Sequence, residues 1–428
     1  MGSSLFNYFE TLIALAVMFT MLVAAHELGH YLFARLFNMG VEEFAIGFGK
    51  RPILQWMRRT YTIPIRPGEI ASIEHSGPSK FDLESAASRP PEDMVEVDTP
   101  SGKALRETTR FTVRAWPLGG FVRIKGMMPE EDGSETKIAG GFYSKPPWQR
   151  LIVLFAGPLF SVLAGILILA PIFMIEGSIP NLKPVLGPLL KGGAAMKAGL
   201  KEGDRIASID GKPVATFYNV VQLVRDSQNK TLNFGVVRGN QTLYFPVKPD
   251  YDEKPTHVLD ATLEPTKETR RQWKLNAQPT FDPAPPVKAL LMACSFPVTA
   301  VAGLGDIVVH PSTFKDQVGG PLSITTATYD TVKMGFSSIL RLAALLSISI
   351  GILNLLPVAP LDGGQIVLAI AEMCRKGRRL SIQFQSMVTM FGFAFMVVLI
   401  ICVCCVDISR IIDNGKAPKE SPPAKATK

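Results

Sequence analysis

The amino-acid sequence predicts an α-helical membrane protein with four transmembrane helices and an additional part of mixed α/β content. Of its 428 residues, 47% are hydrophobic and only 19% are charged, whereas soluble domains carry about 25% charged residues. The apolar residues are concentrated in four nearly uncharged runs. This composition excludes a disordered or a collagen-like chain.

Each of the four runs is long enough to cross a bilayer, which takes about 20 residues in a helix. The runs cover residues 5–33, 151–175, 342–361 and 381–406. They predict a first transmembrane helix within 1–37, a second at 150–176, a third core helix at 337–374 and a fourth at 380–406. Residues 289–305 form a shorter apolar stretch that contains Pro297, and we expect it to be a surface-lying or re-entrant helix.

The positions of the basic residues predict the orientation in the membrane. None precedes Arg35, and two loops that follow the first and third runs are basic. These residues are Arg35, Lys50, Arg51, Arg58, Arg59, Arg375, Lys376, Arg378 and Arg379. Cytoplasmic loops are rich in Lys and Arg, so four spans place both chain ends and residues 177–336 on the outer side. The net charge of +8 is explained in this way, and nucleic-acid binding is not expected.

Three ionisable side chains interrupt the first run, in the sequence His26-Glu27-Leu28-Gly29-His30. In this H-E-x-x-H pattern, positions i and i+4 share one face of a helix, so both imidazoles can bind one zinc ion. Glu27 lies beside them and can act as a general base toward water. A charge at bilayer depth costs at least about 2.5 kcal/mol, so this grouping indicates a functional site rather than an incidental pair of buried histidines.

A catalytic zinc ion needs a third protein ligand and one open position. Asp362 is the best remaining candidate, because it is the only acidic residue in 331–371 and it closes an apolar run. The segment Asn354-Leu-Leu-Pro357-Val-Ala-Pro360 precedes it, and its prolines would break a helix. Broken backbone at membrane depth is tolerated where it lines a cavity. The alternative is that Asp362 only caps a helix at the membrane surface.

These two motifs together resemble those of the site-2 protease family of intramembrane zinc metalloproteases. The segment Phe44-Ala-Ile-Gly-Phe-Gly49 is similar to the family's FxIGFG segment, and Ala156-Gly-Pro158 to the start of its second helix. Pro117-Leu-Gly-Gly-Phe-Val-Arg123 is similar to its PLGGxV strand, part of a membrane-associated β-hairpin or sheet. The similarity covers most of the chain. It departs at Ser161, where the family often carries Asn.

The resemblance implies a role for each motif residue. His26, His30 and Asp362 would be the ligands of Zn²⁺, and Glu27 would be the catalytic base. Asn354 would contact the substrate backbone, and the two prolines would shape the loop. The predicted substrate-binding residues are Asn354, Pro357, Pro360, Gly119 and Gly120.

Residues 178–282, with the sequence 194–214 at their centre, resemble a PDZ domain. A strand at 205–209, between a Gly203-Asp204 turn and an Asp210-Gly211 turn, is also predicted from the residues alone. PDZ domains bind peptides by adding a strand to a sheet edge. We therefore expect Leu186 and Gly187 to receive a peptide or the outer segment of a substrate; the alternative is a spacer that only excludes bulky substrates.

For the remaining segments, the sequence predicts structure but no catalytic or metal-binding residues. Residues 38–149 form a cytoplasmic-side loop that contains the β-hairpin and a polar insert at about 60–110. Residues 283–336 form an amphipathic segment that gates or clamps substrate. The tail at 407–428 is rich in Lys and Pro, which is typical of disorder.

The predicted function is hydrolysis of peptide bonds within transmembrane segments of single-span proteins in the lipid bilayer of a bacterial inner membrane. The substrates would be proteins of the anti-sigma-factor type already shortened by another protease, or remnant signal peptides. One alternative is a metal-binding membrane transporter or ion pathway, since intramembrane carboxylates and broken helices also occur there. Another is a catalytically inactive PDZ scaffold, although such a scaffold would not need Glu27.

Overall fold

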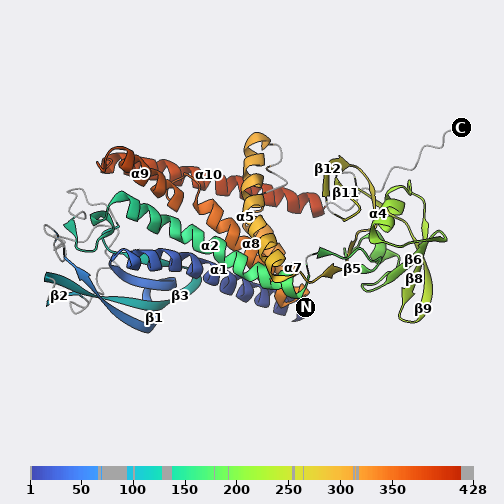
Figure 1. Ribbon diagram of the computed structural model, residues 1–428, viewed down its shortest axis with the longest axis horizontal. Helices are drawn as coiled ribbons and strands as arrows, with labels where there is room; N and C mark the ends of the chain where they lie inside the picture. Colours follow the sequence, from blue (N-terminus) through green and yellow to red (C-terminus); the bar gives the residue numbers. More distant parts are fainter. Residues whose placement is uncertain are drawn as a thin grey trace. The chain divides into compact units, whose positions relative to one another are not determined.

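The computed structural model divides the chain into two compact units, each of which is described by itself. Unit 1 comprises Met1–Leu169 and Ala293–Lys428, and unit 2 comprises Ala170–Met292. Figure 1 shows the elements coloured along the sequence. The structure describes residues 2–65, 69, 94–99, 102–127, 137–177, 179–190, 192–252, 256–263, 265–311, 314 and 318–415.

Helices make up most of unit 1. They are α1 (Gly2–Leu36), α2 (Pro147–Ile175), α5 (Pro286–Val309), α7 (Pro321–Met334), α8 (Phe336–Asn354), α9 (Asp362–Cys374) and α10 (Ile382–Gly415); α2 and α5 each continue into unit 2. The predicted core helix at 337–374 is divided into α8 and α9 by the segment that contains both prolines. Helix α10 continues to Gly415, so residues 407–415 of the predicted tail are helical, and residues 416–428 lie outside the described residues.

Among the described residues, five helices are long and apolar enough to cross a membrane. These stretches are Phe9–Leu36, Pro147–Ile175, Pro286–Val309, Phe336–Asn354 and Ile382–Ser409. Four of them correspond to the four predicted spans. The fifth is α5, which continues as one helix through Pro297; its length and composition alone do not distinguish it from the other four.

Helices α1 and α2 pack against each other so closely that their backbones touch. A Cβ atom placed on Gly29 of α1 would lie 2.3 Å from the carbonyl oxygen of Ala156 of α2, which no side chain could tolerate. Small residues allow this kind of contact between membrane helices. An apolar cluster continues the packing from α1 through the sheet to α2, and it includes Tyr31, Val41, Phe111 and Val153.

A three-stranded antiparallel sheet lies next to α1 in unit 1 (Figure 1). Its strands are β1 (Val41–Pro64), β2 (Met94–Thr99) and β3 (Gly102–Ile124). Phe44 of β1 pairs with both Val122 and Phe111 of β3, so β3 folds back and holds the start of β1 between its two arms. In the part of the chain that the structure describes, no strand pairs with the outer side of residues 120–124. This sheet therefore has a free edge at 120–124.

The same sheet includes much of the predicted polar insert at 60–110. The described residues at its two ends belong to β1, β2 and β3, whereas residues 66–68, 70–93, 100 and 101 lie outside the described part. Strand pairing such as Tyr61 with Glu107 and Thr60 with Thr108 explains why polar residues are ordered there. The described ends of the insert therefore extend the predicted hairpin.

The N-terminus of helix α7 is capped by a buried carboxylate from helix α10. Asp407 of α10 accepts hydrogen bonds from the backbone N–H groups of Gly320, Leu322 and Ser323 at 3.0–3.1 Å. A helix start leaves its first N–H groups without partners inside the helix, and this side chain supplies an acceptor. The predicted amphipathic segment at 283–336 is thus attached to α10 at the start of α7.

Unit 2 contains a four-stranded antiparallel sheet in the order β7-β6-β8-β9. These strands are Lys212–Pro213, Arg205–Ile209, Leu232–Arg238 and Gln241–Val247, and helix α4 (Phe217–Arg225) packs on their apolar core. The predicted strand at 205–209 is confirmed as β6. The smaller elements are β4 (Ile179–Pro180), β5 (Leu186–Leu189), α3 (Ala194–Lys197), β10 (Asp250–Tyr251), β11 (Thr256–Leu259), β12 (Pro265–Arg270), β13 (Trp273–Lys274), β14 (Ala277–Pro279) and β15 (Phe281–Asp282).

Strand β5 has backbone partners on both sides. It pairs with β14, where Leu186 lies opposite Pro279. The N–H of Leu186 also donates to the carbonyl of Asp204, and its carbonyl accepts from the N–H of Gly203. A peptide strand added at Leu186 and Gly187 would therefore have to displace β14 or the turn at Gly203 and Asp204.

An ion pair between a partly exposed arginine and a buried aspartate connects β8 of unit 2 to the turn before β6. Arg238 donates to both carboxylate oxygens of Asp204 at 2.7 Å, and the N–H of Lys201 donates to one of them at 2.8 Å. Burial raises the pKa of Asp204, but the hydrogen bonds from Arg238 and Lys201 outweigh burial and hold the pKa below its usual value. The charged form therefore stabilises unit 2.

We predict that Asp204→Asn lowers the free energy of unfolding of unit 2 at pH 7 by about 1–3 kcal/mol. Because the folded-state pKa is the lower one, this stabilisation is present above the unfolded pKa of about 3.9 and is lost as the pH falls through the folded value. Pulse proteolysis of the full chain in urea between pH 3 and pH 7 measures it. Asp226→Asn is the control, because that carboxylate is exposed. Equal effects of the two variants would contradict the prediction.

Candidate metal centre and active site

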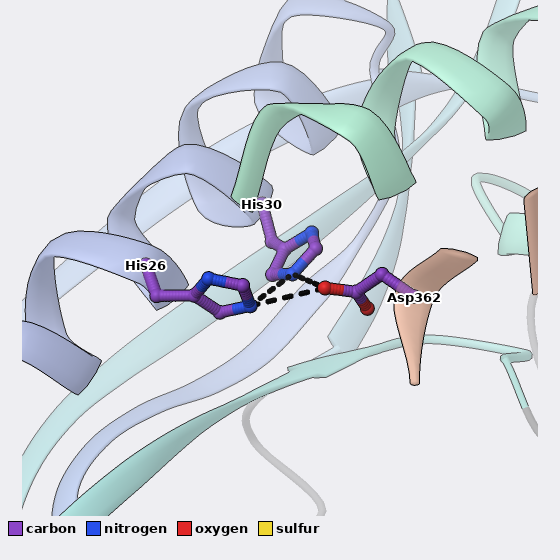
Figure 2. A group of neighbouring side chains, drawn as sticks. All are labelled: His26, His30 and Asp362. Atoms are coloured by element: carbon purple, nitrogen blue, oxygen red, sulfur yellow. Dashed lines mark hydrogen bonds and ion pairs between the residues drawn. The ribbon is translucent and has the colours of Figure 1, made fainter. Parts of the chain in front are cut away.

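Helix α1 places two imidazoles next to each other inside unit 1. His26 and His30 are one helical turn apart, so they share a face of α1. Their Nε2 atoms lie 3.3 Å apart, and both side chains are buried. Figure 2 shows the two rings turned toward the same point.

The third group comes from a distant part of the sequence. Asp362 is the first residue of α9, directly after the broken segment that contains Pro357 and Pro360. Its Oδ2 atom lies 3.0 Å from Nε2 of His26 and 3.4 Å from Nε2 of His30, as Figure 2 shows. In the described residues, this is the one group of three such side chains close enough to share a metal ion.

These three atoms fit a zinc ion. With bonds of 2.0–2.1 Å in tetrahedral geometry, ligand atoms lie about 3.3 Å apart, and the three observed separations are 3.0, 3.3 and 3.4 Å. Two imidazoles and one carboxylate also form a ligand set that catalytic zinc sites use, with the fourth position open. The chemistry of the donors and their spacing therefore agree with the predicted ligands.

The remaining ring nitrogens have partners on α2. Nδ1 of His30 donates to the carbonyl of Val153 at 2.9 Å, and Nδ1 of His26 lies 2.9 Å from Oγ of Ser161. A carbonyl only accepts, so in the neutral imidazole of His30 the lone pair is on Nε2, which is the atom that faces Asp362.

Glu27 lies at the boundary between the metal centre and the sheet. Its Oε2 accepts a hydrogen bond from the backbone N–H of Val122 at 2.9 Å, and Val122 belongs to the free edge at 120–124. A cavity lies between these groups. Its lining residues are His26, Glu27, His30, Phe121, Val122, Ile124, Met127, Val153, Leu154 and Asp362.

The predicted substrate-binding residues fall into three places. Asn354 is the last residue of α8, with Nδ2 3.5 Å from Nε2 of His26. Pro357 and Pro360 lie in the segment between α8 and α9, where both are exposed. Gly119 and Gly120 lie in β3 at the start of the free edge. Leu186 and Gly187 belong to unit 2.

A buried ion pair holds the far end of α9. Arg150, near the start of α2, pairs with Glu372, near the end of α9, and both side chains are less than one-tenth exposed. Removing one member of such a pair leaves a buried charge without compensation, which is strongly destabilising. The pair therefore anchors the helix that begins with Asp362 to the helix that supports the histidines.

Two of the site's contacts were not predicted from the sequence, namely those of Ser161 and of Val122. Ser161 is a polar residue in an otherwise apolar run, which is a signal that could have identified it. Val122 contacts Glu27 through its backbone N–H, and the identity of its side chain does not predict such a contact.

An H-E-x-x-H helix, a carboxylate from a second helix and several membrane-length helices define the class of membrane-embedded zinc metallopeptidases. The chain belongs to Peptidase family M50, whose sequence profile matches residues 14–90 and 99–399. The predicted site-2 protease family is thereby confirmed. The enzyme is a zinc metallopeptidase and a multi-pass membrane protein, so the transporter alternative is wrong.

Several similar proteins carry names of the same kind. The "Regulator of sigma-W protease RasP" of Bacillus subtilis is 28% identical, over 94% of this chain and 99% of its own length. The "Zinc metalloprotease RasP" of Bacillus licheniformis is 29% identical over the same shares. The "Probable protease eep" of Enterococcus faecalis is 27% identical, again over 94% of this chain and 99% of its own.

We predict that Asp362→Ala weakens zinc binding by more than about 100-fold, because the loss of an outer partner alone costs 10–100-fold. Competition with a chromogenic chelator on the purified chain measures the Kd. Asp306→Asn serves as the control, because Asp306 lies on α5 with an exposed side chain. Unchanged zinc affinity in Asp362→Ala would rule out the three-ligand centre.

Proposed function

We propose that this chain hydrolyses peptide bonds within transmembrane segments of single-span membrane proteins. The observation that carries the proposal is that His26, His30 and Asp362 converge beside the free edge at 120–124. The substrates are proteins already shortened by another protease, such as those of the anti-sigma-factor type, or remnant signal peptides. The name of the Bacillus subtilis relative, a regulator of sigma-W, supports the first class.

The proposed chemistry assigns one task to each group around the cavity. His26, His30 and Asp362 hold zinc, which when bound polarises the scissile carbonyl and makes water easier to deprotonate. Glu27 takes the proton from the attacking water and passes it to the leaving amine. The N–H of Val122 holds one carboxylate oxygen of Glu27, which leaves the other oxygen available for the water.

The sheet edge supplies what an unwound substrate needs. A transmembrane helix has its amides in internal hydrogen bonds, and it must unwind before water can attack. An extended segment can then pair with backbone groups of the free edge at 120–124 other than the N–H of Val122, which holds Glu27, because such edges accept added strands. Gly119 and Gly120 start this edge, and Asn354 offers an amide 3.5 Å from Nε2 of His26. Pro357 and Pro360 keep the segment before Asp362 from becoming helical.

The proposed topology places α1, α2, α8 and α10 across a bacterial inner membrane, with both termini on the outer side. The basic residues after α1 and those between α9 and α10 then share the cytoplasmic side, as positively charged loops do. If α5 also crossed, these two groups would face opposite sides, so we assign α5 to the membrane surface or to a re-entrant position. Residues 283–336, with α7, act as a gate or clamp for substrate.

Unit 2 is proposed to be a PDZ domain on the outer side. It binds the outer segment of a substrate or excludes substrates with bulky outer domains. Since β5 has partners on both sides, binding at Leu186 and Gly187 requires displacement of β14 or of the turn at Gly203 and Asp204. An inactive scaffold is not favoured, because Glu27 and all three ligand atoms are in place.

We predict that Glu27→Gln retains zinc but lowers cleavage by at least about 100-fold, because a general base contributes 10²–10⁴-fold. Co-expression with candidate single-span proteins, followed by detection of accumulated substrate, tests it. The control is Glu10→Gln, the same change on an exposed residue of the same helix. Cleavage by Glu27→Gln at the wild-type rate would refute the assignment of the base.

We predict that Val122→Pro lowers kcat by about 10–100-fold with unchanged zinc content, because it removes the N–H that orients Glu27. Proline is tolerated on an edge strand where the N–H points away from the ladder. Val122→Ala is the matched control, since it keeps the N–H. Equal kcat values for the Pro and Ala variants would show that this hydrogen bond has no role in orienting the base.

A further inference from the structure

One face of α2 follows the two histidines of α1 turn by turn. Val153, Gly157 and Ser161 are four residues apart, so they lie in one row along α2. Val153 contacts His30 at one end of the row, and Ser161 contacts His26 at the other. The order of the contacts is therefore reversed between the two helices: the earlier residue of α2 meets the later histidine of α1.

The middle position of the row makes room for the imidazoles. A Cβ atom on Gly157 would lie 2.2 Å from Nε2 of His30, so any side chain there would occupy the space of the ring. With Gly157 in place, the ring of His30 lies directly against α2, and its Nδ1 reaches the carbonyl of Val153. The two ends of the row are thus held at hydrogen-bond distance from the two rings.

The groups on α2 that contact the two histidines differ in chemical type. The acceptor for His30 is a backbone carbonyl, which any residue at position 153 would supply. The partner of His26 is a side-chain hydroxyl on Ser161, which is completely buried. A buried hydroxyl without a partner costs free energy, and the ring of His26 provides that partner. The backbone of Ser161 is held as well, because its carbonyl accepts from Oγ of Ser347 on α8 at 2.7 Å.

We propose that Ser161 is a positioning residue of the metal centre. Its hydroxyl accepts the Nδ1–H of His26, which turns the Nε2 lone pair toward Oδ2 of Asp362 and the zinc ion. Without this acceptor the ring of His26 is free to rotate or to carry its proton on Nε2, and either change removes a ligand. Ser161 is the one side chain in the row of Val153, Gly157 and Ser161 that sets the orientation of a ligand.

The test compares two changes of a buried serine to alanine, of which only one removes a hydroxyl that contacts a histidine. Ser161→Ala removes the hydroxyl at 2.9 Å from His26, whereas Ser347→Ala removes an equally buried hydroxyl whose hydrogen bond goes to the backbone carbonyl of Ser161 and not to a histidine. The zinc Kd of each purified full-length variant is measured by chelator competition. The visible absorption of the Co²⁺-substituted proteins reports the ligand geometry directly.

We expect Ser161→Ala to raise the zinc Kd by about 10–100-fold and to alter the Co²⁺ bands. Ser347→Ala should stay within about twofold of wild type with an unchanged spectrum, and Ser161→Thr, which keeps the hydroxyl, should restore most of the affinity. The proposal is overturned if Ser161→Ala binds zinc like wild type, or if both alanine variants weaken zinc equally, since the second result indicates packing alone. This role of Ser161 rests on the zinc centre of the proposed function, but the experiment distinguishes the two. Absence of zinc from the wild-type protein refutes the zinc centre itself. Equal zinc binding by the wild type and Ser161→Ala refutes only the role of Ser161.

Discussion

Two imidazoles and two carboxylates lie among helices long enough to cross a membrane, and each buried polar atom there costs free energy unless it is paired. The arrangement of unit 1 follows from the need to supply these partners. Helix α2 supplies an acceptor for each histidine, the sheet edge supplies an N–H for Glu27, and α9 supplies the carboxylate that faces both rings. Helix α2, the sheet edge and α9 therefore each provide a hydrogen-bond partner for a buried polar side chain of the candidate site.

The supporting interactions lie progressively farther from the metal centre. Asp362 can approach the histidines because the chain breaks between α8 and α9, and the buried pair of Arg150 and Glu372 holds the other end of α9 against α2. The free edge at 120–124 is positioned by β1, which the two arms of β3 enclose. The side chains of the candidate site are thus placed by helices and strands rather than by loops, which favours precise geometry.

The grouping of the candidate site's side chains was predictable where the residues are close in the sequence or stand out in its composition. His26, Glu27 and His30 lie within one turn of one helix, and Asp362 is the only acidic residue of its segment, so spacing and composition were sufficient. Ser161 and Val122 reach the site across 135 and 95 positions, and such contacts depend on packing that periodicity does not encode. The second partner of β5 was missed for the same reason, since β14 follows far along the chain. Residues 60–110 were predicted as an insert because they lack an apolar pattern. Their described ends are nevertheless paired in the sheet, since cross-strand pairs also stabilise polar strands.

The backbone contact between α1 and α2 limits how the cavity can be reached. Because Gly29 rests against the carbonyl of Ala156, these two helices leave no room for a substrate between them, and separating them would also pull both histidines away from their partners on α2. For the proposed polypeptide substrate, this contact favours entry on the side of the cavity lined by Phe121, Val122 and Asp362. The side of the cavity formed by α1 and α2 is therefore closely packed, and it carries the two histidines of the candidate metal centre.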